Sequence, residues 1–515
     1  MSFQLSKSKL YIASIIAGVL AVFAYAPYGF LPAFIISIII LLFIIDHSKN
    51  LKSAITSGYL YGLGFFIGGL HWFCYALMTD FKRLFWLIPF SATTAQAFLA
   101  LYIGIFGFLS FIKFKNEFYR IYFLACSWTI IEWLRGNLFS GFPWIISGYA
   151  FDGIDGVSQL ASITGIYGLS FLILIISLSF NLLLKLRNSM ALINFIIIAI
   201  CTISIQYYGI KKIEQQDLNN KAMPQILLVQ IGPTDHITNR KEALARFYDH
   251  LNLTKQYYSG EETIIWPESS HPFLIDIKQN QFGNLFNFMN EKSKLILGSP
   301  SVTYNSNDNS TNYWNSILSV NRDGTIENHY NKMHLVPFGE YIPFYQYLPP
   351  IKIITERSTS YSSQNKMEYI KINDHYFRPL ICYEAIFSDH PIDPSHRADY
   401  IINITNDNWY GDSLGPYQHF SMTKFRAIEQ GMPLVRVAIS GISAVIDSYG
   451  RVVNKIDLNH KGVISSTIPQ AQLHKALYSI RLEKIMIAIF ALLAAILFMT
   501  RNYKLKYRLV DKIIQ

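Results

Sequence analysis

Charged residues are scarce in this chain of 515 residues, because Asp, Glu, Lys and Arg together make up only 15%. A soluble domain is nearer to one quarter charged, so the composition excludes an ordinary soluble protein and indicates that much of the chain lies in lipid. Hydrophobic residues reach 51%. The net charge of +10 does not indicate nucleic-acid binding, because the basic residues fall mostly in short loops between apolar runs and form no aromatic-laced patch.

Cysteine is equally scarce, with four residues in the whole sequence. Three of them, Cys74, Cys126 and Cys201, lie in apolar runs, where a cysteine is ordinarily a small buried hydrophobe. Cys382 is the one cysteine of the polar part of the chain, so a disulfide framework is excluded there. A lone cysteine is more often an inert core thiol than a nucleophile. Only its surroundings can reverse that expectation.

Two further signatures are missing from the sequence. No cluster of His, Cys, Asp and Glu has the spacing of a metal site, and no glycine-rich loop of the kind that cradles a phosphate is present. We therefore expect neither a metal nor a bound cofactor.

Long apolar runs dominate the first two hundred residues. A helix needs about 20 apolar residues to cross the hydrocarbon core. We predict an N-terminal transmembrane domain of about seven helices over 1–212, and a C-terminal segment, 480–515, made of one transmembrane helix and a cytoplasmic basic tail. The eight predicted spans lie near residues 10–27, 30–46, 54–78, 85–112, 119–138, 160–184, 189–209 and 484–500. A cleavable signal peptide is disfavoured, because no polar mature domain follows the first run.

Basic residues between the apolar runs predict the orientation in the membrane. The loops that precede the first run and follow the second, fourth and sixth are rich in lysine and arginine, and all fall on one side. By the positive-inside rule this side is the cytoplasm. Lys82 and Arg83 after the third run are an exception that Asp80 partly offsets. Seven crossings from an inside N-terminus place the polar block, 223–470, on the extracytoplasmic face.

The polar block alternates short β-branched runs with helical stretches, which predicts an α/β layered domain. Strands are predicted at 225–230, 263–266, 294–298, 377–382, 400–405 and 433–440, and helices at 240–257 and 418–430. The aperiodic segment 343–366 is either a plain surface loop or a lid over a site.

Glu268, Lys332 and Cys382 each end a strand-like segment of this block, about fifty to sixty-five residues apart. A thiol becomes a good nucleophile once it is deprotonated, which a neighbouring cation or base favours. Lys332 would supply the positive charge, and Glu268 would take the thiol proton and return it to the leaving group. An attacked acyl carbonyl develops negative charge on its oxygen, and Lys332 with a backbone N–H beyond Cys382 are candidate donors to it.

Each of these residues also has a purely structural interpretation. Glu268, after Trp266-Pro267, could cap a following helix, and Lys332 could be a solvated surface lysine. Three further residues are candidates for a supporting role: Glu340, Tyr383 and Glu384. Glu340 could support the thiol, position Lys332, or merely pair with a cation.

Taken together, the motifs Trp-Pro-Glu, Tyr-Asn-Lys and Cys-Tyr-Glu, in this order, resemble the triad of the nitrilase (carbon-nitrogen hydrolase) superfamily. With its multi-span membrane half and closing helix, the whole chain resembles the apolipoprotein N-acyltransferase family. Ser440-Gly441 departs from the Asn-Gly expected in that family, which leaves the contacts of this loop open. The matching stretches are 132–136, 141–144, 335–341, 405–412, 415–420 and 426–427.

The resemblance implies a multi-pass enzyme of the bacterial inner membrane with a nitrilase-type α/β sandwich domain on the periplasmic face. It also implies a two-step acyl transfer. Cys382 would take a fatty acyl group from a phospholipid, expected to be phosphatidylethanolamine, and the α-amine of a diacylglyceryl-modified N-terminal cysteine on an apolipoprotein would then receive it. No cofactor is needed, because the donor is already an activated ester.

Two other functions remain open at this point. The first is a membrane-tethered nitrilase-type amidase that hydrolyses an amide with the same triad, water resolving the thioester. The second is a transporter or receptor whose outer domain is a catalytically dead binding module.

Glu132 and Arg135 end the fifth apolar run, and ionisable groups near the membrane are functional candidates by default. One interpretation is an interfacial salt bridge or a snorkelling pair. The other is docking of a lipid head group or of a loop.

Overall fold

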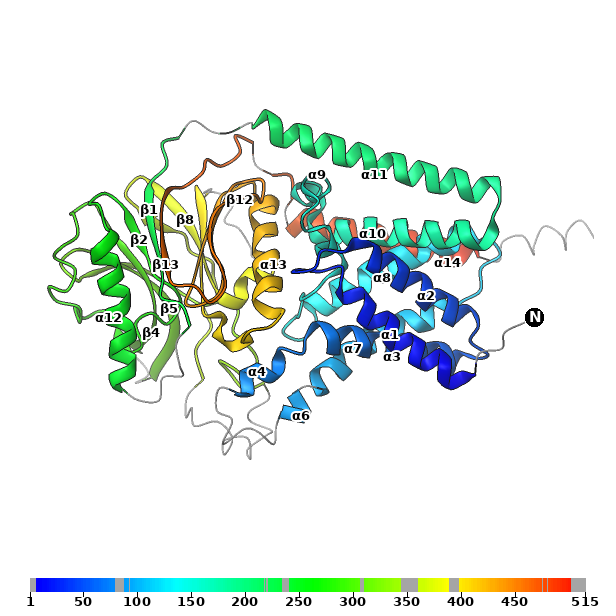
Figure 1. The fold of residues 1–515 in the computed structure, drawn as a ribbon, viewed down its shortest axis with the longest axis horizontal. Helices are drawn as coiled ribbons and strands as arrows, with labels where there is room; N and C mark the ends of the chain where they lie inside the picture. The colour runs from blue at the N-terminus through cyan, green and yellow to red at the C-terminus, as the bar shows by residue number, and fades with distance from the viewer. Residues whose placement is uncertain are drawn as a thin grey trace, which may run out of the picture. The chain divides into compact units, whose positions relative to one another are not determined.

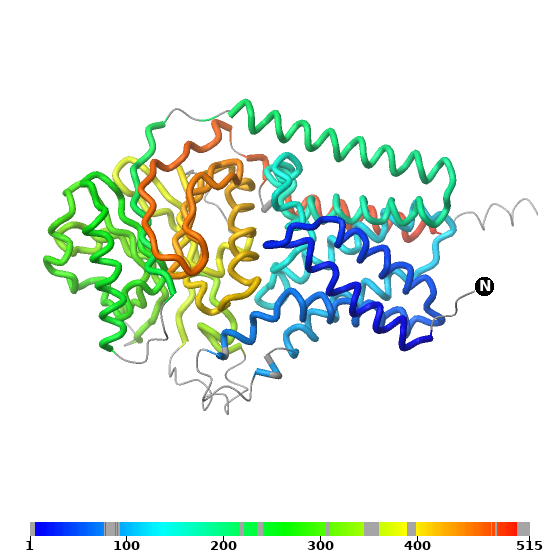
Figure 2. Tube along the Cα trace, in the orientation of Figure 1, coloured from blue at the N-terminus to red at the C-terminus, as the bar shows by residue number. Residues whose placement is uncertain are grey.

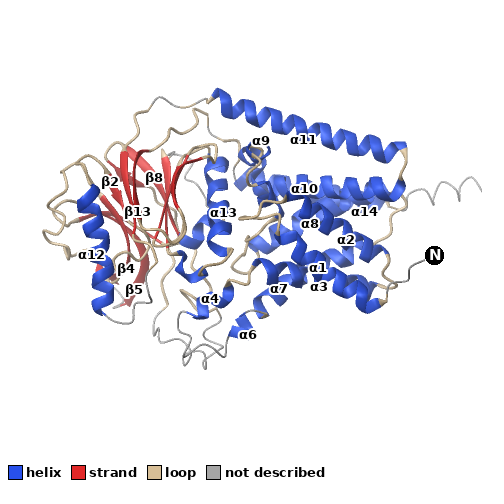
Figure 3. Ribbon diagram, viewed as in Figure 1, coloured by secondary structure: helices blue, strands red, loops and turns tan. Residues whose placement is uncertain are grey.

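The computed structural model describes residues 6–78, 88–91, 93–216, 218, 221–233, 240–305, 310–343, 360–388, 398–474, 476–478 and 480–501. The chain divides into two compact units. The first unit comprises 1–215, 412–421 and 477–515, and the second comprises 216–411 and 422–476. Every strand of the described residues belongs to the second unit, as the red segments of Figure 3 show.

The first unit is helical. In the described residues, each of its eight longest helices overlaps one of the eight predicted apolar runs. These helices are α1 (Lys7–Val22), α2 (Leu31–Asp46), α3 (Leu51–Gly69), α7 (Thr94–Ser110), α8 (Glu117–Asn137), α10 (Ala161–Leu186), α11 (Ser189–Gln215) and α14 (Ile480–Thr500). The shorter ones are α4 (Phe73–Met78), α6 (Ile88–Ser91), η2 (Ser147–Phe151) and α9 (Asp155–Ser158).

Three helices of the described residues are long and apolar enough to cross a membrane: Ala161–Leu186, Ser189–Gln215 and Leu482–Thr500. The helices α2 and α7 are apolar but have only 16 and 17 residues. The helix α8 has 21 residues, but four of them are the charged side chains Glu117, Arg120, Glu132 and Arg135. Length and composition therefore support a membrane protein but give three spans by these criteria, fewer than the eight predicted.

The third and fourth predicted runs are not single helices. The helix α3 ends at Gly69 and α4 begins only at Phe73, whereas α7 begins at Thr94 and not near residue 85. Apolar composition does not by itself decide where a helix ends. Lys82 and Arg83, the exception to the charge rule, lie outside the described residues.

Glycines let α3 approach two neighbouring helices closely. A Cβ on Gly18 of α1 would lie 2.0 Å from the carbonyl oxygen of Tyr61, and one on Gly58 would lie 2.6 Å from that of Ile103 in α7. Small residues permit such contacts, which helices need in lipid, where no hydrophobic force drives them together. The helix α10 is kinked at Gly165, whose φ is 64°, and it runs beside α11 (Figure 2).

The second unit is a sandwich of two sheets. One sheet has the order β13-β1-β2-β4-β5-β6, with β3 paired to β4, and the other has the order β12-β11-β10-β9-β8-β7. The strands β1, β2 and β4 are parallel, as are β8, β9 and β10. The strands are β1 (Gln225–Gln230), β2 (Thr263–Ile265), β3 (Ile275–Asp276), β4 (Leu295–Asn305), β5 (Ser310–Val320), β6 (Ile326–Asn331), β7 (Ile370–Ile372), β8 (His375–Ile381), β9 (Tyr400–Thr405), β10 (Leu434–Ala438), β11 (Ser443–Ile446), β12 (Val452–Ile456) and β13 (Gly462–Thr467).

The helix α12 (Arg240–Tyr257) covers the outer face of the first sheet (Figure 1). Its Phe247 and Leu251 are buried in one core with Leu227 of β1, Leu297 of β4 and Trp266. This layering confirms the predicted α/β sandwich, and the predicted bounds of α12, β1 and β9 agree to the residue. The predicted helix at 418–430 is the larger part of α13 (Gly415–Gln430).

Candidate active site

Each predicted catalytic residue lies just beyond the end of a strand of the second unit. Glu268 follows β2, Lys332 directly follows β6, and Cys382 directly follows β8. All three are buried, with 6%, 1% and 5% of their surface exposed. Cys382 begins the short 3-10 helix η5 (Cys382–Ile386) with a φ of 50°. Residues other than glycine rarely adopt this left-handed backbone conformation, and those that do are often found at functional sites.

Lys332 lies among carboxylates. Its Nζ is 3.9 Å from Oε1 of Glu268 and 3.0 Å from the carboxylate of Glu340. Asn315 joins these two carboxylates, because its Nδ2 donates to Oε1 of each at 2.8 Å. The other oxygen of Glu268 accepts from the backbone N–H of Asn406 at 2.8 Å. A turn, not a helix, directly follows Glu268, so it does not cap a following helix, and the buried Lys332 is not a solvated surface lysine.

A line of hydrogen bonds runs from the Cys382 thiol into the second sheet. The Thr405 side chain hydrogen-bonds the thiol, and its Oγ1 donates to Oδ1 of Asp407 at 2.8 Å. The other oxygen of Asp407 accepts from Nη2 of Arg436 at 2.6 Å. Arg436 is fully buried and also donates to side chains of β9 and α13. A buried ion pair thus holds Thr405, which contacts the Cys382 thiol.

Burial controls ionisation in this site. The pKa of the Cys382 thiol is raised to about 12, chiefly by burial and then by the charge of Glu268, while Lys332 opposes both. Burial also raises the pKa of Glu268. In Lys332, burial acts to lower the pKa, but Glu340 and Glu268 outweigh it and the pKa is raised. Burial therefore favours the neutral thiol over the thiolate in the free site.

The three supporting candidates make different contacts. Glu340 holds Lys332, and Tyr383 is buried with its ring against that of His334. Glu384 ties the turn after β6 to the turn after β8. Its carboxylate accepts four hydrogen bonds, from the Tyr330 hydroxyl and from the backbone N–H groups of Met333, His334 and Ile381.

Sequence reasoning missed Asn315, Thr405, Asp407 and Arg436 as members of the site. One signal was available: Arg436 is the single charge in the otherwise apolar strand β10 and therefore needed a buried partner. Asn315 gave no such signal, because an Asn in a long antiparallel strand is unremarkable until its neighbours are known. Within the described ranges no group of three or more His, Cys, Asp and Glu residues is placed to hold a metal ion.

Glu132 and Arg135, in the first unit, hold a loop. Oε1 of Glu132 accepts from the backbone N–H and the hydroxyl of Ser147, at 2.9 and 2.6 Å. Nη1 of Arg135 donates to the carbonyl oxygens of Phe142 and Trp144, at 2.9 and 2.8 Å. Both charged side chains are buried, so loop docking describes them and snorkelling does not.

Comparison with known proteins finds matches over most of the chain. The family model for the apolipoprotein N-acyltransferase N-terminal domain matches residues 17–179, and the carbon-nitrogen hydrolase model matches residues 228–477. A protein of Rhizobium rhizogenes named apolipoprotein N-acyltransferase is 32% identical over 489 residues, which cover 91% of this chain and 92% of that one. The chain belongs to the apolipoprotein N-acyltransferase family. A relative with the same name from Rickettsia typhi is 32% identical over 472 residues, covering 90% of this chain and 92% of its own.

Members of this family are acyltransferases, and the second unit is its nitrilase-type α/β sandwich. Two solved structures resemble the chain more distantly. A carbon-nitrogen hydrolase superfamily protein from Xanthomonas campestris has a TM-score of 0.36 and 17% identity, covering 53% of this chain and 97% of that one. A nitrilase superfamily member from Saccharomyces cerevisiae has a TM-score of 0.36 and 16% identity, covering 48% of this chain and 91% of its own.

Glu340→Gln is expected to move the acidic limb of the pH–activity profile to lower pH. After burial, the charge of Glu340 helps to raise the pKa of Glu268, against Lys332. Removing that charge favours the ionised form of Glu268, so the base works at lower pH. The measurement is kcat/KM against pH for the native chain and the variant.

The matched control for this experiment is Glu327→Gln, which removes a half-exposed carboxylate of the same unit that pairs with Lys294. Its acidic limb should stay in place. An upward shift in Glu340→Gln, or an equal shift in both variants, would contradict the assignment of Glu268 as the base.

Proposed function

We propose that the protein transfers a fatty acyl group from a membrane phospholipid, through a thioester on Cys382, to the N-terminal α-amine of a diacylglyceryl-cysteine on apolipoproteins. The product is the mature triacylated lipoprotein. The observation that carries this proposal is the burial of a thiol, a carboxylate and an ammonium, which interact electrostatically, at the ends of three strands of one domain. The family name of the relatives supports the same substrates.

In the first step, Glu268 takes the proton of the Cys382 thiol as the sulfur attacks the acyl carbonyl carbon of the ester. Because the free thiol is neutral, proton transfer accompanies the attack. The carbonyl oxygen becomes negative and is stabilised by Lys332 and by a backbone N–H beyond Cys382. The C–O bond then breaks, the lysophospholipid alcohol leaves with the proton from Glu268, and the acyl group remains as a thioester.

In the second step, the amine nitrogen of the acceptor attacks the thioester carbonyl. Glu268 removes a proton from that nitrogen, an amide bond forms, and the C–S bond breaks. The thiolate that leaves recovers its proton from Glu268, which restores the starting site. Glu340 and Asn315 act as positioning residues throughout, because they hold Lys332 and Glu268 at their distances.

We place the enzyme in the bacterial inner membrane with three parts: residues 1–212 as a transmembrane domain of about seven helices, 223–470 as the periplasmic catalytic domain, and 480–515 as a closing transmembrane helix with a basic cytoplasmic tail. The basic loops support this orientation. Donor and acceptor are both anchored in the bilayer, so the active site needs access to lipid. Phosphatidylethanolamine is the donor we propose.

The deciding experiment incubates the purified full chain with phosphatidylethanolamine carrying a labelled acyl chain and with a diacylglyceryl-cysteine peptide. We expect label on the amine of the peptide and an equivalent amount of lysophospholipid. A membrane-tethered amidase would release labelled free fatty acid and leave the peptide unmodified. A binding module would release neither product, and either result would overturn the proposal.

A further inference from the structure

The helical unit contains a cavity of about 550 Å³ that plays no part in the proposed chemistry. It lies where α2, α7 and α10 end and α8 begins, and all of its lining residues belong to the first unit. Volumes of roughly 300–1,000 Å³ are typical of ligand sites. The cavity is therefore large enough to hold a lipid head group and the first part of its chains.

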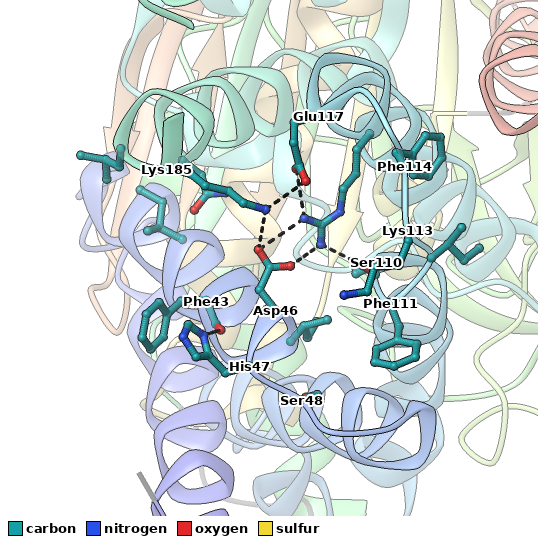
Figure 4. A pocket seen from close by; sticks show the side chains of 16 residues that line it. Phe43, Asp46, His47, Ser48, Ser110, Phe111, Lys113, Phe114, Glu117 and Lys185 are labelled. Atoms are coloured by element: carbon teal, nitrogen blue, oxygen red, sulfur yellow. Dashed lines mark hydrogen bonds and ion pairs between the residues drawn. The ribbon is translucent and has the colours of Figure 1, made fainter. Parts of the chain in front are cut away.

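One wall of the cavity is an ion-pair network (Figure 4). The guanidinium of Arg120 lies 2.5 Å from Asp46 and 3.3 Å from Glu117. Nζ of Lys185 lies 3.1 Å from each of the same two carboxylates. Two cations and two anions from three helices thus balance one another, which fixes the shape of this wall.

Lys113 is the remaining charged residue of the lining, and it is exposed. In the part of the chain that the structure describes, it makes no hydrogen bond and no ion pair. The lining therefore has three cations against two carboxylates, which leaves one net positive charge. Lys185 also has a third N–H beyond the two that its ion pairs use. Both groups can donate to an anion.

The rest of the lining is largely apolar. Ile39, Phe43, Phe111 and Leu184 contribute to it, and Phe43 is 50% exposed. A cationic edge beside exposed aromatic and aliphatic side chains matches a molecule with an anionic head and hydrocarbon chains. The loops at this end are also the basic ones, so the positive-inside rule assigns it to the cytoplasmic leaflet, where basic pockets between helices bind anionic lipid head groups.

We propose that this cavity is a binding site for an anionic phospholipid of the cytoplasmic leaflet. Lys113 and Lys185 contact its phosphate, and Phe43 and Phe111 contact its acyl chains. This lipid is a bound component of the membrane domain and is not the acyl donor, because no residue proposed for acyl transfer lines the cavity. The site stands independently of the proposed function.

The test is native mass spectrometry of the detergent-solubilised full chain with Cys382→Ala, so that no lipid is consumed, titrated with dioleoyl phosphatidylglycerol. Dioleoyl phosphatidylcholine and inorganic phosphate are titrated separately. We expect phosphatidylglycerol to bind more tightly than phosphatidylcholine. The Lys113→Ala substitution should lower the affinity for phosphatidylglycerol about fivefold, which corresponds to about 1 kcal/mol for one lysine near the lipid surface.

The matched control is Lys115→Ala, which removes an exposed lysine from the same loop that does not line the cavity. The affinity of this variant for phosphatidylglycerol should equal that of the parent chain. Equal weakening by both variants would show general attraction of basic loops to anionic lipid and would overturn the site. Displacement of phosphatidylglycerol by inorganic phosphate would show a site for small anions and would overturn the lipid site. Equal affinity for phosphatidylglycerol and phosphatidylcholine would show that the lipid's charge has no role and would also overturn it.

Discussion

Cys382→Ser is expected to abolish acyl transfer, with a loss of about a thousandfold or more. A serine hydroxyl is far less acidic than a thiol, and in this buried pocket even the thiol has its pKa raised to about 12. Glu268 would have to remove a much more tightly held proton. The measurements are the rate of N-acylated peptide formation and the intact mass of the chain after exposure to phospholipid.

The intact mass separates the first half-reaction from the second. The native chain should gain one fatty acyl group that hydroxylamine removes, as expected for a thioester, and the serine variant should gain none that hydroxylamine removes. Cys201→Ser is the control, because Cys201 is a free, exposed thiol on α11. An acyl adduct that survives in Cys382→Ser and disappears in Cys201→Ser would end the proposed mechanism.

Asp407→Ala is expected to destabilise the second unit by about 3–5 kcal/mol, because it leaves a fully buried guanidinium without its anion. Asp407 and Arg436 have no exposed side-chain surface, and their charged atoms are 2.6 Å apart. Activity should fall as well, since Thr405 loses the carboxylate that orients its hydroxyl beside Cys382. Denaturant unfolding of the full chain in detergent, followed with a probe in the catalytic domain, measures the stability.

Two variants test this explanation. Asp457→Ala removes a carboxylate from the exposed pair with Lys455 and should cost about 1 kcal/mol or less. Adding Arg436→Met to Asp407→Ala should restore part of the lost stability, because the uncompensated charge is gone. If Arg436→Met lowers the free energy of unfolding as much in the Asp407→Ala background as in the native chain, the two residues do not act as an ion pair.

Glu268, Lys332 and Cys382 could be singled out from the sequence because each follows a short strand-like run. Glu268 and Lys332 follow strands of one sheet, β2 and β6, whereas Cys382 follows β8 of the other sheet, so the packing of the two sheets brings the three together. The strand ends at Ile265 and Ile381 were within one residue of their predicted positions. The antiparallel strands β5, β7, β11, β12 and β13 were missed, because their local pattern is weak and pairing with other strands stabilises them.

In the helical unit, the sequence predicted where helices occur better than where they end. Apolar runs located its eight longest helices among the described residues, yet they overestimated the lengths of α3 and α7. Hydropathy reports where a segment prefers lipid, whereas close contacts such as that between Gly58 and Ile103 decide where a helix can pass its neighbour.

The amino-acid sequence alone predicted the α/β sandwich and the membrane association and singled out Glu268, Lys332 and Cys382, because these follow from local composition and from residue types at strand ends. Only the tertiary structure decided the protonation of Cys382, the tasks of Glu340 and Glu384, and the support from Asp407 and Arg436. Those properties depend on burial and on distances between segments far apart in the chain, and electrostatic interactions in a low-dielectric interior vary steeply with both.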